Sequence, residues 1–136
     1  MNIATKRRPR NRRKGAAAVE FAITAPVLFL FVFTSVEFAR MNMIRHTVDN
    51  AAYEAARAGI VPGATSENVE GRARSIMSYV GAVGVDVVIT PTVILPETEE
   101  VTVEVSVPCN HNGFLAPHFF ADSVLAGTTT MTREAL

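Results

Sequence analysis

Residues 16–38 read AAAVEFAITAPVLFLFVFTSVEF, and this stretch decides the fold class of the chain. Only two charged residues, Glu20 and Glu37, interrupt it. A helix rises about 1.5 Å per residue, so roughly 20 apolar residues are enough to cross the hydrocarbon core of a bilayer. The stretch therefore predicts a transmembrane helix over residues 16–39.

The charges around this stretch are unevenly distributed, although the chain of 136 residues has a net charge of zero. Residues 1–14 hold seven of the thirteen basic residues and no acidic residue, whereas the rest holds six basic and thirteen acidic residues. Basic residues collect on the cytoplasmic side of membrane helices. We therefore expect residues 1–15 to form a basic cytoplasmic leader and the C-terminal part to be exported. No nucleic acid is expected as a partner, because a membrane helix directly follows the basic residues.

A cleaved secretory signal also begins with basic residues followed by apolar ones. The apolar stretch here is longer than the usual signal core of about 7–15 residues. A cut after Ala39 would also place Glu37 at the −3 position, where small residues are required. We therefore expect the helix to stay in the membrane as a single-pass anchor.

The sequence KGAAAVEF at residues 14–21 resembles the processing site of type IV prepilins: a basic leader, a glycine, and an apolar helix with glutamate at its fifth position. The pattern continues with Pro26, with VEFAR at residues 36–40 and with NAAYEAARA at residues 50–58. In these features the chain resembles the TadE family of pseudopilins. The resemblance covers about residues 12–58 and says little about residues 60–136.

This resemblance implies a minor pilin-like component of a bacterial tight-adherence (Flp-type) pilus or secretion system, anchored in the inner membrane. It implies two kinds of protein partner besides the lipid bilayer: a prepilin peptidase that cuts between Gly15 and Ala16, and other pilins and pseudopilins. It also implies assembly roles for Glu20, Phe21 and Glu37, and it implies no cofactor. Major Flp pilins are far shorter and usually carry Tyr where Phe21 stands, which favours the pseudopilin interpretation.

Glu20 is informative for a physical reason as well. A carboxylate costs roughly 2.5 kcal/mol or more at the bilayer centre and less near the interface, so it usually has a partner. Cleavage before Ala16 would create an α-amino group one helical turn away, at the positive end of the helix dipole. We expect Glu20 to pair with that amine in its own or a neighbouring chain. The alternative is a carboxylate that only lies among the lipid head groups.

The membrane helix is predicted to continue as an extension over residues 40–60. Its apolar positions follow a spacing of three and four residues, which marks one helix face: Met41, Ile44, Val48, Ala51, Ala55 and Ala58. Half of these residues are alanine, so a neighbour can approach closely. The pattern does not decide whether this neighbour is a partner chain or the chain's own exported domain.

Residues 61–136 predict an exported α+β domain. Thr65 or Ser66 can cap a second helix, whose apolar face consists of Val69, Ala73, Ile76 and Val80. Alternating residues over 85–90, 101–107 and 125–131 then predict strands. The expected architecture is pilin-like: a long N-terminal transmembrane helix that continues into a head of a second helix and a small antiparallel sheet.

The loop after residue 108 contains Cys109, His111 and His118, which are possible metal ligands. Their spacing matches no familiar metal site and a fourth ligand is absent. We expect a packed loop that buries aromatic side chains, namely Phe114, Phe119 and Phe120. No catalytic motif is found, so an enzyme is not expected. The alternative function is an uncut, membrane-anchored domain that binds partners through its exported head.

Overall fold

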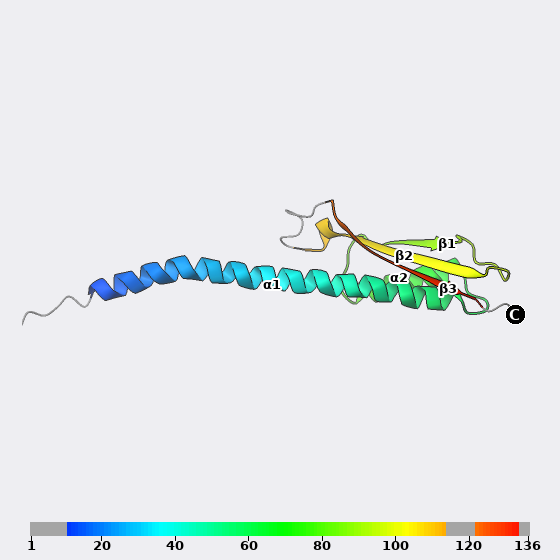
Figure 1. Ribbon diagram of the computed structural model, residues 1–136, viewed down its shortest axis with the longest axis horizontal. Helices are drawn as coiled ribbons and strands as arrows, with labels where there is room; N and C mark the ends of the chain where they lie inside the picture. Colours follow the sequence, from blue (N-terminus) through cyan, green and yellow to red (C-terminus); the bar gives the residue numbers. More distant parts are fainter. Residues whose placement is uncertain (1–10, 114–121, 134–136) are drawn as a thin grey trace, which may run out of the picture. The chain divides into compact units, whose positions relative to one another are not determined.

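The computed structural model describes residues 11–113 and 122–133, and for residues 11–14 it describes the backbone alone. The N-terminal leader up to Arg10 lies outside the described residues. The elements, in chain order, are α1 (Asn11–Gly59), α2 (Ser66–Ser78), β1 (Asp86–Thr90), β2 (Glu100–Pro108), the short 3₁₀ helix η1 (Cys109–His111) and β3 (Val124–Thr132), as Figure 1 shows. The chain divides into two compact units, Met1–Val36 and Glu37–Leu136.

The described part of the first unit is the N-terminal portion of α1. Its large apolar side chains are exposed, with Phe21 at 71% and Phe31 at 68%. The helix is long and apolar enough to span a membrane, and it is the one such helix among the described residues. Exposed apolar surface of this extent is stable when lipid or another protein surrounds it. The prediction of a helix that could cross the membrane is therefore confirmed, and the helix begins earlier than expected, at Asn11.

The second unit is the head, which contains the C-terminal portion of α1. Four residues of the predicted stripe, Ile44, Val48, Ala51 and Ala55, are buried within the head, so this face of α1 packs on the chain's own domain. The stripe is wrong at its two ends, where Met41 and Ala58 are only half-buried. Six residues of α1 are at most 1% exposed: Ile44, Val48, Ala51, Ala52, Ala55 and Ala56. Alanine has no side chain beyond Cβ, so the helix backbone lies close to the sheet. At its C-terminal end, the Cβ of any residue replacing Gly59 would lie 2.9 Å from Val101 Cγ1.

Helix α2 begins where its capping residue predicts. The Thr65 hydroxyl accepts a hydrogen bond from the Asn68 backbone N–H at 3.3 Å, which satisfies one of the free donors of the first turn. Val69, Ala73, Ile76 and Met77 are buried. The predicted Val80 lies beyond the end of the helix and is half-buried against the core.

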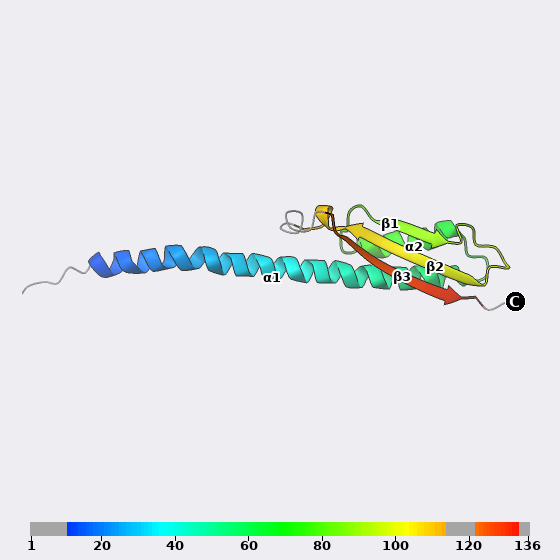
Figure 2. The ribbon, with the colours of Figure 1, turned by 45° about the horizontal axis from the view of Figure 1, so that its top comes forward.

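The three strands form one antiparallel sheet in the order β1-β2-β3. Strand β2 is central, and its four inward valines are fully buried: Val101, Val103, Val105 and Val107. They join the buried residues of α1 and α2 in a single core cluster. The opposite face carries polar residues such as Thr102 and Glu104. Figure 2 shows the strands running along the helix layer. The predicted α+β architecture of two helices on a small antiparallel sheet is confirmed.

Candidate functional site

The proposed processing site lies in an exposed part of α1. Gly15 and Ala16 are exposed, and a side chain added at Gly15 would meet no other atom within 4 Å. A protease must unwind a helix locally to reach a peptide bond. Glycine favours such unwinding, since it is about 1 kcal/mol poorer than alanine as a helix former. No described residue covers this peptide bond.

Glu20 and Phe21 lie in the next turn of the same helix, and both are exposed. The Thr24 hydroxyl donates to the Glu20 backbone carbonyl at 2.9 Å, so this threonine is bound to its own helix. Pro26 leaves the Ala22 carbonyl without its usual backbone donor. The Thr24 hydroxyl does not supply that donor, since it bonds to the carbonyls of Glu20 and Phe21.

Glu37 and Arg40 stand at the beginning of the head. Glu37 is 8% exposed and Arg40 is half-buried, so both side chains are partly shielded from solvent. Arg40 Nε donates to the backbone carbonyl of Asn112 at 2.7 Å. The arginine of the VEFAR segment therefore binds α1 to the segment that follows η1.

Asn112 extends this connection to a third segment. Its side chain is almost fully buried, and its Oδ1 accepts a hydrogen bond from the Val83 backbone N–H at 2.8 Å. Its Nδ2 donates to the carbonyls of Val83 and Pro108, each at 2.8 Å. Asn112 thus joins the α2–β1 loop to the end of β2. Sequence reasoning missed this residue.

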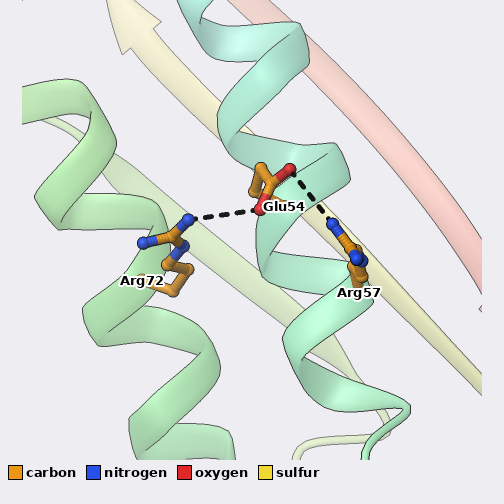
Figure 3. A network of polar contacts seen from close by, with 3 residues as sticks. All are labelled: Glu54, Arg57 and Arg72. Atoms are coloured by element: carbon orange, nitrogen blue, oxygen red, sulfur yellow. Dashed lines mark hydrogen bonds and ion pairs between the residues drawn. The ribbon is translucent and has the colours of Figure 1, made fainter.

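Glu54 forms a second connection, between the two helices of the head (Figure 3). Its Oε2 lies 3.2 Å from Arg72 Nη2 on α2, and its Oε1 lies 3.9 Å from Arg57 Nη1 on α1. Glu54 and Arg57 belong to the NAAYEAARA segment, whose alanines at positions 51, 52, 55 and 56 are buried. The segment therefore packs α1 into the head with its alanines and binds α2 with its glutamate.

The cysteine–histidine loop is described in part. Cys109 is 5% exposed, and burial raises the pKa of its thiol. His111 is exposed, whereas His118, Phe114, Phe119 and Phe120 lie outside the described residues. Among residues 11–113 and 122–133, no three potential metal ligands lie together.

The fold and these residues define the class of the protein: an α+β protein whose N-terminal helix could span a membrane and also contributes the central helix of its head. Comparison with known families gives a match that lies within α1. Residues 15–57 match the family described as TadE-like protein. The predicted resemblance to the TadE-like family is confirmed over this segment, which covers nearly all of α1 from Gly15 onward. No match was found among curated proteins or among solved structures.

Proposed function

We propose that the chain is a minor pilin-like subunit, a pseudopilin, in the assembly of a Tad (Flp-type) pilus or secretion system. The match of residues 15–57 to the TadE-like family carries this proposal. The structure adds a physical reason for the extent of the match. One continuous helix includes both the apolar stretch and the buried stripe of the head. The residues that suit a membrane and the residues that pack the head therefore lie in the same segment.

The proposed topology follows from the charges. The basic leader stays in the cytoplasm, α1 crosses the inner membrane of a bacterium, and the head is exported. A prepilin peptidase cuts between Gly15 and Ala16, where the chain is exposed. The chain then works with other pilins and pseudopilins, and it has no catalytic role of its own.

Glu20 is the residue to which we assign the assembly step. After cleavage, the new α-amino group of Ala16 lies one turn before Glu20. Pairing of this carboxylate with the amine of a neighbouring subunit offsets the cost of both charges in lipid. Removing one member of such a pair leaves the other buried and uncompensated, which is strongly unfavourable.

The test is the substitution Glu20→Gln, made at the native locus. Insertion does not need this charge, because an uncharged residue is cheaper to place in lipid. The variant should therefore reach the membrane at the normal level while pilus number falls, and Glu20→Asp should give an intermediate number. Glu67→Gln, at an exposed position in α2, is the matched control and should leave pilus number unchanged. Normal piliation with Glu20→Gln would contradict the assembly role and favour an uncut membrane anchor.

A further inference from the structure

Strand β3 forms one edge of the sheet, and its outer side is the strongest candidate for an unassigned binding site. The strand is nine residues long and reads VLAGTTTMT, without a charged residue and without proline. Natural edge strands normally avoid unwanted pairing by being short or by carrying charge, proline or a bulge. This strand uses neither charge nor proline, and it is not short.

The hydrogen-bond pattern identifies which backbone groups of β3 point outward. Just beyond the ends of the ladder, the Arg133 N–H donates to the Glu99 carbonyl at 2.7 Å and the Cys109 N–H donates to the Ser123 carbonyl at 2.9 Å. Directly bonded pairs alternate in an antiparallel ladder, so the odd-numbered residues of β3 bond to β2. The N–H and C=O groups of the even-numbered residues point away from the sheet. These residues are all exposed: Val124, Ala126, Thr128, Thr130 and Thr132.

The opposite edge, strand β1, is less suited to pairing. It has five residues, it begins at Asp86, and Pro91 follows it. The even-numbered residues of β1 bond to β2 in the alternating pattern. Within the strand, only Val87 and Ile89 therefore direct their N–H and C=O groups away from the sheet. The long, uncharged edge is therefore specific to β3.

The helix layer restricts what can pair with β3. The Cβ of a residue replacing Gly127 would lie 3.1 Å from the Asp49 Cα, so α1 lies directly against β3. A neighbouring strand adds at about 4.8 Å, whereas packed helices need about 8–10 Å between their axes. If a second copy paired its own β3 antiparallel to this one, the α1 helices of the two copies would lie closer together than packed helices allow. The occupant must be a strand without a helix on that face.

We propose that the outer edge of β3 is a strand-addition site that binds an extended, uncharged segment of another exported protein. The backbone groups of the even-numbered residues supply the hydrogen bonds, and the small side chains of Ala126 and Thr128 leave room for the added strand. An uncharged segment fits because β3 itself carries no charged side chain that could pair with a charged one. The site concerns the head alone: it rests on the proposed export of the head, and it does not depend on cleavage at Gly15 or on the role of Glu20.

The experiment uses the full chain in its native membrane, with a photo-crosslinking amino acid at position 126. Irradiation should give an adduct in which the label maps to one extended, uncharged segment of a different protein. Thr128→Pro removes an N–H that points away from β2 and bonds to no other described residue, and proline is tolerated at such edge positions. The adduct yield should then fall by about fivefold or more, the factor expected for a lost backbone hydrogen bond.

Two controls separate strand addition from other kinds of contact. Thr128→Val keeps the N–H and should keep the adduct, whereas a loss with both variants would show side-chain recognition and overturn the proposal. Protease resistance of the head reports folding, and Thr132→Pro replaces Thr128→Pro if the latter unfolds. The absence of any adduct, or an adduct with a second copy of this chain, would also overturn the proposal. Piliation is not a readout, so a failure of the proposed role in pilus assembly does not change the result of this experiment.

Discussion

Replacing Asn112 with alanine should destabilise the head, because this buried side chain makes three hydrogen bonds at 2.8 Å. Each such bond contributes about 1 kcal/mol net, and a partner that stays buried without a replacement costs more. Val83 is itself exposed, so water can replace part of what its backbone loses. The expected loss in the free energy of unfolding is therefore about 2–3 kcal/mol.

Asn112→Asp tests the hydrogen-bond geometry without changing the size of the side chain. The aspartate keeps the acceptor that faces the Val83 N–H. It replaces the Nδ2 donor by an oxygen that faces the carbonyls of Val83 and Pro108. A charged oxygen facing two carbonyls is repelled by them, so this variant should be at least as unstable as the alanine variant.

The assay is pulse proteolysis of the detergent-solubilised full chain in urea, which follows unfolding of the head while α1 stays in the micelle. With a urea slope of about 1–1.5 kcal/mol per molar for a domain of this size, the midpoint should fall by about 2 M. Asn110→Ala, an exposed neighbour, is the control and should change stability by less than about 0.5 kcal/mol. Equal midpoints for the Asn112 and Asn110 variants would refute the structural role assigned to Asn112.

Three further predictions concern other contacts of the head. The pair of Glu54 and Arg72 should show a coupling of about 0.5 kcal/mol in a double-mutant cycle, weaker at high salt, because both side chains are partly exposed. Gly127→Ala should cost about 1–3 kcal/mol in urea unfolding, because the new Cβ would lie 2.6 Å from Asp49 Oδ1 and 3.1 Å from its Cα. Burial raises the pKa of Cys109, so the unfolded chain loses this proton first. Stability should therefore be complete below the unfolded thiol pKa of about 8.5 and fall as pH rises above it, and Cys109→Ala should remove this dependence.

The sequence predicted those parts of the fold that local patterns determine. Alternation of valine with polar residues over 101–107 requires one buried and one exposed face, and β2 has both. A cap at Thr65 or Ser66 predicted the start of α2, and Thr65 is the residue whose hydroxyl accepts a bond from the first turn. The stripe on α1 was ambiguous, since an alanine-rich face suits a partner chain as well as the chain's own sheet. Only the tertiary structure decides between these neighbours.

The contacts that the sequence did not reveal join residues far apart in the chain. Asn112 binds the backbone of Val83, 29 residues away, and backbone atoms leave no residue-specific signal. The pair of Glu54 and Arg72 was missed for a related reason, since its members lie on two helices and 18 residues apart. Gly15 and Glu20 are different, because their predicted roles depend on a peptidase and on neighbouring subunits. The fold of a single chain shows that both positions are exposed.

The central claim is that this chain functions as a processed, pilin-like subunit. Its most direct test is the intact mass of the protein extracted from native membranes. We predict a mature chain that begins at Ala16, with the same species lost when Gly15 is replaced by leucine. A mass corresponding to all 136 residues in the native membrane would contradict the claim.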